Sequence, residues 1–160
     1  MRTYIKGAKI IGDFDSELNA ASLTDPSKRV LANQITAIWQ WRMSPKRSWI
    51  LECIPVQAGT EWSGSTHVEN VQWLIPAWAE YSSASLVREH CSGKCLLANG
   101  KCMTKAHGDL LFINLLRWLA ANRVVGGWKY RPQLALAELL YTARLMYDAV
   151  DWKDHEHSEH

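Results

Sequence analysis

The sequence has no long run of apolar residues. No stretch approaches the roughly 20 apolar residues that a membrane-spanning helix requires, and residues 1–9 hold no apolar segment of signal-peptide length. These absences argue against a membrane-embedded protein and against a membrane partner. They predict a protein of the reducing cytoplasm.

The sequence also lacks the motifs of the common catalytic sites. It has no Gly-x-x-x-x-Gly-Lys-Ser/Thr loop, no Gly-x-Gly-x-x-Gly fingerprint and no Gly-x-Ser-x-Gly nucleophile elbow. The zinc deaminase pairing of His-x-Glu with Pro-Cys-x-x-Cys is absent as well. We therefore expect a non-enzymatic role, with a small metalloenzyme as the weaker alternative.

Composition predicts one globular domain with a distinct tail. Hydrophobic residues make up 48% of the 160 residues and charged residues 21%, as in soluble folded proteins. The formal charge is +2, but five acids and one base lie from Asp148 onward, so residues 1–147 carry +6. We expect a domain over 1–150 and a flexible, acidic, His-containing tail over 151–160. A basic body attracts phosphate backbones through counterion release, although ordinary solvated charge also accounts for it.

Cysteine is scarce but clustered. Cys91, Cys95 and Cys102 fall within twelve residues, and His107 follows five positions later. Thiolate and neutral imidazole are the ligands that zinc prefers, and the Asn99-Gly100 turn signal folds the segment back on itself. The spacing predicts a structural zinc site formed by Cys91, Cys95, Cys102 and His107.

Other interpretations of the cysteines stay open. Two of the three clustered residues could form a disulfide, or all four could be small buried hydrophobic residues. An iron–sulfur cluster would need Cys53 as a fourth thiolate and would leave His107 without a role.

Nine tryptophans are unusual for a chain of this length. Their size makes it difficult to bury all of them, so some should lie half exposed. A half-exposed indole can stack on an unpaired base or anchor a protein partner. The tryptophans are Trp39, Trp41, Trp49, Trp62, Trp73, Trp78, Trp118, Trp128 and Trp152.

Aromatic and basic residues interleave most closely in one short stretch. It contains Trp41, Arg42, Lys46, Arg47 and Trp49, the combination that binds nucleic acid through stacking and charge. We predict that these five residues form a nucleic-acid-binding surface. A helix end, a turn and a buried strand would be the alternative.

The apolar spacing predicts a mainly α fold. A helix is expected over 26–42, with Asp25 as its N-cap; on it Trp39 faces the core and Trp41 is turned about 200° away toward the ligand. A compact bundle of about four helices follows, with a small N-terminal β element and the Cys/His turn between helices. The other expected elements are a strand or strand pair within 3–14, a strand over 49–56 stopped by Pro55, a helix from a capping box at Thr66 and Glu69 toward the cysteines, and helices over 109–125 and from 132 to about 150.

Two functions of different classes agree with these features. The first is a nucleic-acid-binding accessory protein, or a subunit of a nucleoprotein assembly, with a structural zinc site. The second is a protein-binding adaptor or inhibitor that uses exposed tryptophans.

Overall fold

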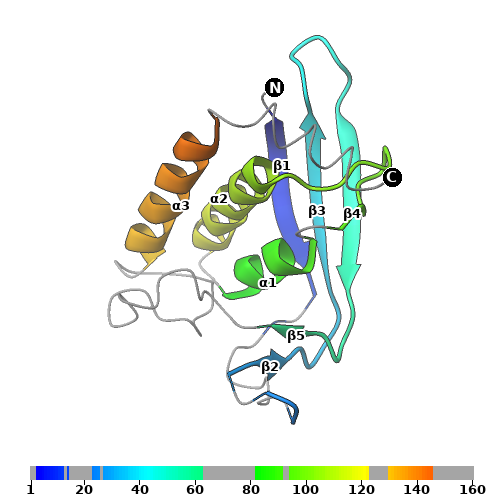
Figure 1. The fold of residues 1–160 in the computed structure, drawn as a ribbon, viewed down its shortest axis with the longest axis vertical. Coiled ribbons are helices and arrows are strands. Elements are labelled where there is room, and N and C mark those ends of the chain that lie inside the picture. Colours follow the sequence, from blue (N-terminus) through cyan, green and yellow to red (C-terminus); the bar gives the residue numbers. More distant parts are fainter. Residues whose placement is uncertain are drawn as a thin grey trace.

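The structure is a computed structural model that describes residues 3–12, 14, 23–25, 27–62, 82–91, 94–122 and 130–145. Within these residues the chain forms five strands and three helices (Figure 1). The strands are β1 (Tyr4–Ile11), β2 (Arg29–Val30), β3 (Ile35–Arg42), β4 (Ile50–Val56) and β5 (Glu61–Trp62). The helices are α1 (Ser82–Cys91), α2 (Lys105–Ala121) and α3 (Tyr130–Leu145).

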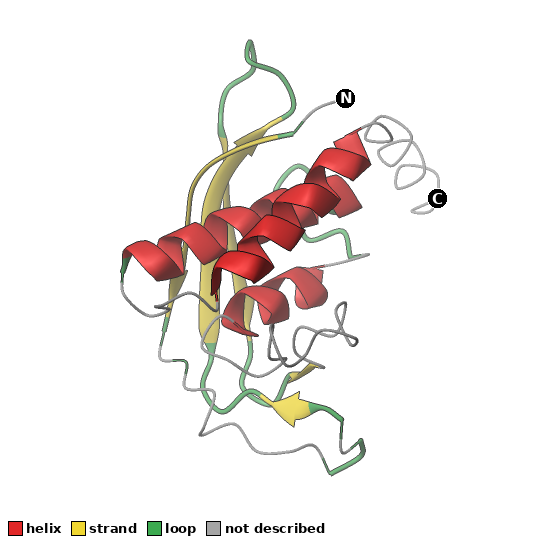
Figure 2. Cartoon of the chain, turned by 90° about the vertical axis from the view of Figure 1, so that its left-hand side faces the viewer, coloured by secondary structure: helices red, strands yellow, loops and turns green. Residues whose placement is uncertain are grey.

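The strands form two antiparallel sheets. The larger sheet has the order β1-β3-β4, and β2 pairs with β5 in a small second sheet. Helix α2 packs against β1, while α1 and α3 pack against α2. Figure 1 shows the three helices on one side of the larger sheet, and Figure 2, viewed from that side, shows them in front of it. The described helices therefore leave the opposite face of this sheet open, which we call the outer face.

The expected mainly α bundle is wrong, and the error lies chiefly in residues 26–42. Instead of a helix, this segment contains β2 and all of β3. Along β3, Ile35, Ala37, Trp39 and Trp41 are buried and alternate with half-buried residues. That period of two belongs to a strand, and β-branched and aromatic side chains favour it. The apolar residues of this segment fit both the helical period of 3.6 and the strand period of two. Pairing with β1 and β4 selects the strand.

Asp25 makes a turn and caps no helix in the described residues. Its carboxylate accepts hydrogen bonds from the backbone N–H of Ser27, at 3.0 Å, and from the Ser27 hydroxyl, at 2.7 Å. This is the Asx-turn geometry that short polar side chains form in loops. Asp25 therefore belongs to a turn rather than to a helix start.

The other elements agree better with expectation. The strands within 3–14 and 49–56 are confirmed as β1 and β4. Pro55 lies inside β4, which tolerates it because β4 is an edge strand. Helix α2 begins at Lys105, earlier than expected, because Thr104 caps it by accepting the His107 backbone N–H at 3.0 Å.

Some expectations concern parts of the chain that the structure does not cover. The capping box at Thr66 and Glu69 and the tail over 151–160 lie outside the described residues. The helix expected after that capping box is described only over α1, where it reaches Cys91.

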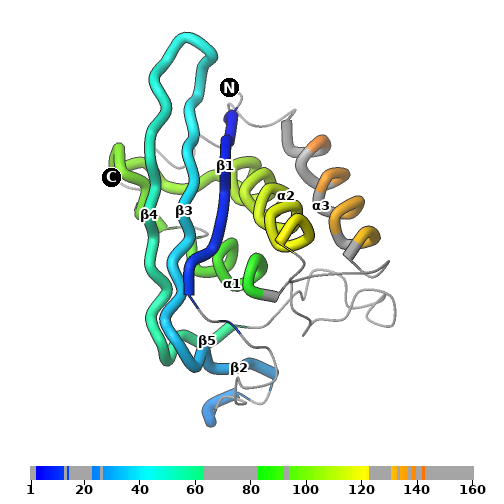
Figure 3. The backbone as a smooth tube through the Cα atoms, turned by 180° about the vertical axis from the view of Figure 1, so that it is seen from behind, coloured from blue at the N-terminus to red at the C-terminus, as the bar shows by residue number. Residues whose placement is uncertain are grey.

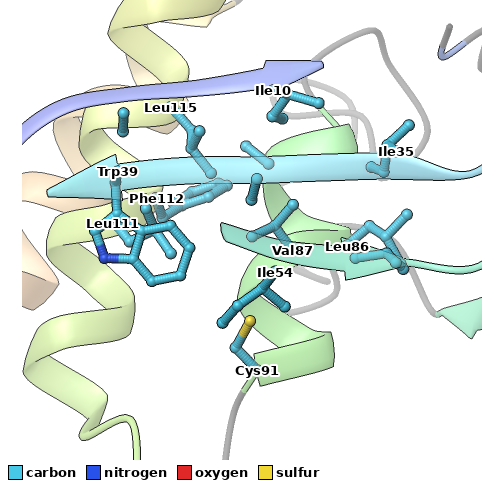
Figure 4. Close-up of a cluster of buried hydrophobic side chains, with 14 of the residues drawn as sticks. Ile10, Ile35, Trp39, Ile54, Leu86, Val87, Cys91, Leu111, Phe112 and Leu115 are labelled. Carbon is cyan, nitrogen blue, oxygen red and sulfur yellow. The ribbon is translucent and has the colours of Figure 1, made fainter. Parts of the chain in front are cut away.

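One hydrophobic core joins the sheet to the helices. Figure 4 shows side chains from β1, β3 and β4 meeting those of α1 and α2. Ion pairs link the helices at the edge of this core, from Arg88 to Asp109 between α1 and α2 and from Arg117 to Glu138 between α2 and α3. The packing holds the larger sheet against a fixed helical layer.

A β-bulge in β1 determines which side chains reach the outer face. Gly7 has φ of +65°, and the pairing with β3 shifts register between Lys6 and Lys9. In a regular strand these two lysines, three positions apart, would point to opposite faces. The extra residue restores the same parity, so both lysines are exposed while Ala8 and Ile10 are buried.

We predict that Gly7→Ala lowers the free energy of unfolding by about 1 kcal/mol, because a Cβ destabilises the left-handed conformation. Space is not the cause, since an added Cβ would meet nothing within 4 Å. Gly7→Asn should lose less, because asparagine tolerates this conformation. The matched control is Gly108→Ala in α2, which should be neutral or stabilising. Urea denaturation measures all three, and equal effects at positions 7 and 108 would contradict the bulge assignment.

Candidate functional site

The structure places the four residues of the expected zinc site in different environments. Cys91 ends α1 and is buried in the hydrophobic core (Figure 4). Cys95 and Cys102 are joined in a disulfide. His107 lies in the first turns of α2, fully buried, and its Nε2 accepts a hydrogen bond from Nε1 of Trp39 at 3.1 Å.

The assignment of these residues as a metal-binding group is therefore corrected. No three histidine, cysteine or acidic side chains of the described residues are arranged to hold a metal ion. Two of the sulfurs bond each other, and the Nε2 lone pair of His107 is used by an indole. Of the alternatives, the structure takes the disulfide between two clustered cysteines. It also places Cys53 on the exposed side of β4, away from the buried Cys91.

Burial sets the protonation of the two remaining candidate ligands. It raises the pKa of the Cys91 thiol to about 12 and lowers the pKa of His107 to about 3. Near neutral pH, Cys91 is thus a protonated thiol and His107 a neutral imidazole. Cys91 lies in the hydrophobic core, where it acts as a packing residue.

The Asn99-Gly100 turn is confirmed. The backbone N–H of Gly100 donates to the carbonyl of Leu97 at 2.8 Å, and Gly100 has φ of +81°. The Cys95–Cys102 disulfide closes the loop around this turn. The loop in turn presents the Ala98 backbone N–H to Glu52 of β4, at 2.8 and 3.0 Å from the two carboxylate oxygens.

Glu52 is a buried carboxylate with several partners. Besides Ala98, its Oε1 accepts a hydrogen bond from Nε1 of Trp41 at 2.7 Å. Burial raises its pKa, and the bonds from Trp41 and Ala98 oppose that rise. The Trp41 ring also lies 4.9 Å from the His107 ring. Glu52, Trp41, Trp39 and His107 thus form one buried polar cluster on the inner face of the sheet.

This cluster overturns one predicted contact residue and confirms a core residue. Trp41 is 0% exposed, so it cannot stack on a ligand, and its assignment to the nucleic-acid surface is wrong. Trp39 is buried, as expected. The reason is the strand period, because residues two apart in β3 share a face, whereas in a helix they would not.

The remaining four residues of the predicted surface come together at one end of the sheet. The Arg42 guanidinium lies 4.1 Å from the centroid of the Trp49 ring, and Nη1 of Arg42 donates to the Arg47 carbonyl at 3.4 Å. Lys46 and Arg47 are exposed in the loop between β3 and β4, which extends beyond the sheet at the top of Figure 3. Four of the five predicted residues therefore lie at the surface, and Trp41 does not.

Lys6 joins this surface and was missed by the sequence reasoning. Its Nζ lies 5.7 Å from the centroid of the Trp49 ring, although 43 positions separate the two residues. Only the pairing of β1 with β3 brings them together. Assigning residues 35–42 to a strand that pairs with residues 4–11 would have placed Lys6 near this surface.

Tryptophan exposure can be judged for five of the nine. Trp39, Trp41 and Trp62 are buried, while Trp49 and Trp118 are half buried. The other four lie outside the described residues. The partly exposed indole of Trp49 lies among cations, with Arg42 and Lys6 near its ring.

No protein-family model, curated protein or solved structure matches this chain. Over residues 82–91, 105–121 and 130–145, no helix is long and apolar enough to cross a membrane.

We predict that His107→Gln weakens the acid sensitivity of folding. The unfolded chain binds a proton on this histidine below its ordinary pKa of 6.5, whereas the folded protein does so only near 3. The free energy of unfolding therefore falls as the pH drops through this window, by up to about 1.4 kcal/mol per pH unit. Glutamine still offers Trp39 an acceptor oxygen. Between pH 6.5 and 4.5 the variant should lose about 2 kcal/mol less than the wild type in urea denaturation.

His90→Gln is the matched control for that measurement. The pKa of His90 is also lowered, by burial and by Lys94, but the side chain is only half buried. The His90→Gln substitution should therefore change the pH dependence of the free energy of unfolding less than His107→Gln does. Identical slopes for the wild type and His107→Gln would show that His107 is not buried in its neutral form.

We predict the opposite pH dependence for Glu52. As the pH rises above 4.5, the unfolded chain releases this proton before the folded protein does, so the free energy of unfolding falls. Glu52→Gln removes that term, and its stability relative to the wild type should increase from pH 5 to pH 8. Glu52→Leu should be less stable than Glu52→Gln by about 1–3 kcal/mol, because two N–H groups lose their acceptor. A wild-type-to-Gln difference that does not vary with pH would argue against a buried carboxylate.

Proposed function

We propose that this protein binds nucleic acid through the surface formed by Lys6, Arg42, Lys46, Arg47 and Trp49. The observation that carries the proposal is the Trp49 ring with the Arg42 and Lys6 cations over it, beside the basic β3–β4 loop. A guanidinium stacked on an indole keeps its N–H edges for phosphate oxygens. The half-buried indole holds both cations at the surface of the protein.

The distribution of charge supports this proposal. Residues 3–12 and 35–56, which contain the larger sheet and its hairpin loop, hold five bases and one acid. The acid is Glu52, which is buried on the inner face and held by Trp41 and Ala98. The described outer face and loop therefore present positive charge alone. Such a surface attracts a polyanion without any sequence recognition.

The adaptor alternative draws less support from the described tryptophans. Three of five are buried in the core, and Trp49 lies among cations. A protein hot spot is typically an apolar aromatic centre with charge kept at its rim. The proposed role of an accessory protein or nucleoprotein subunit thus rests on the charge of this surface and on the cations around Trp49.

We predict that Lys46→Ala/Arg47→Ala weakens oligonucleotide binding for all sequences. The slope of log K against log salt should flatten by roughly 1.5, from about 0.7–0.9 per lost phosphate contact. Both side chains are exposed, so thermal stability should barely change. Fluorescence anisotropy with a labelled oligonucleotide between 50 and roughly 200 mM salt measures the slope.

A double variant elsewhere controls for the loss of net charge. Lys105→Ala/Arg131→Ala removes two exposed bases from the helical layer, on the other side of the sheet. This control variant should change the oligonucleotide affinity, and the slope of log K against log salt, much less than Lys46→Ala/Arg47→Ala does. No binding of any oligonucleotide at low salt would refute the proposed function.

A further inference from the structure

The outer face of the larger sheet is divided lengthwise by chemistry. The strand register places its side chains in three columns, one per strand. The column on β1, which we call the basic column, has two lysines between Tyr4 and Ile11, the column on β4 is apolar, and the column on β3 is mixed. The members are Tyr4, Lys6, Lys9 and Ile11 on β1, Thr36, Ile38, Gln40 and Arg42 on β3, and Leu51, Cys53 and Pro55 on β4.

The basic column exists because of the bulge at Gly7. Lys6 lies opposite Gln40 and Lys9 opposite Ile38. These partners are two residues apart on β3, so the lysines stand about 7 Å apart along the strand direction. Successive phosphates of an extended single strand have a comparable separation. Both lysines are exposed, and they continue the line of positive charge that Arg42 begins.

The apolar column on β4 is exposed to solvent. Leu51 is 59% exposed, and Cys53 and Pro55 are exposed beside it. In the middle column Ile38 and Gln40 are half buried, which leaves an apolar surface and one amide between the two edges. Neighbouring strands lie about 4.8 Å apart, so the basic and apolar columns are separated by roughly 10 Å.

From this arrangement, and resting on the proposed function, we propose that the ligand is a single-stranded nucleic acid lying along the outer face. Its phosphates follow Lys6 and Lys9, and its bases lie across Ile38 and Gln40 toward Leu51. One end of the strand reaches Arg42 and Trp49. A duplex keeps its bases inside and would present phosphates to the apolar column, whereas a single strand offers both an anionic edge and apolar base faces.

The test compares a labelled single-stranded DNA, the RNA of the same sequence and the corresponding DNA duplex by fluorescence anisotropy. We expect at least one single strand to bind about tenfold tighter than the duplex. The tighter of the two single strands identifies the sugar. Lys6→Ala/Lys9→Ala should weaken single-strand binding and flatten its salt slope by roughly 1.4, at about 0.7 per contact.

The apolar column is tested separately. Leu51→Glu should weaken single-strand binding strongly, because it adds an acid where bases lie. Leu51→Ser should weaken it by about threefold through lost base contact alone. Leu139→Glu on α3, where the leucine is 66% exposed, is the matched control and should have no effect. Melting curves show whether each variant is folded.

The outcomes separate the two proposals. Duplex binding as tight as single-strand binding, or no effect of either Leu51 variant, would overturn the single-strand inference. If Lys46→Ala/Arg47→Ala still weakened binding in that case, the proposed function would stand. Absence of binding to all three oligonucleotides at low salt would overturn both.

Discussion

The arrangement of this domain depends on two indoles that share one face of β3. Trp39 and Trp41 are fully buried, and an indole N–H that is buried needs an acceptor. Trp39 finds one in His107 of α2, and Trp41 finds one in Glu52 of β4. Glu52 also accepts the Ala98 N–H from the loop that the Cys95–Cys102 disulfide closes. A helix, an edge strand and a loop are thereby fixed to the central strand.

Burial favours the neutral form of both acceptors. Because one is a base and the other an acid, their pKa values shift in opposite directions. Burial keeps His107 neutral by lowering its pKa and disfavours the ionised form of Glu52 by raising its pKa. Lowering the pH below 6.5 therefore destabilises the fold through His107, and raising it above 4.5 destabilises the fold through Glu52. The bonds of the two indoles specify one arrangement of these elements, because a shift that breaks either bond leaves a buried indole N–H without its acceptor.

Sequence reasoning found the short strands, the later helices and the basic stretch, but it could not find the sheet. Residues 35–42 fit a helical face and an alternating strand almost equally, and the choice depends on pairing with β1 and β4, which are distant in sequence. Taking the wrong period put Trp41 on the surface. Similarly, cysteine spacing indicates that Cys95 and Cys102 can meet, but both zinc and a disulfide need that proximity. Lys6 and Lys9 share a face only because of a bulge at Gly7.

The inner cluster and the outer face are two sides of the same three strands. In β3, Trp39 and Trp41 point inward while Ile38, Gln40 and Arg42 alternate with them on the outer side. Anchoring the inner side chains to α2, β4 and the disulfide-closed loop therefore holds the outer columns in place before any ligand arrives. A surface that is already ordered loses little conformational entropy on binding. The burial of Trp41, which removes it from the proposed contact surface, is thus part of what holds Arg42 and its neighbours in place for the contact that we propose.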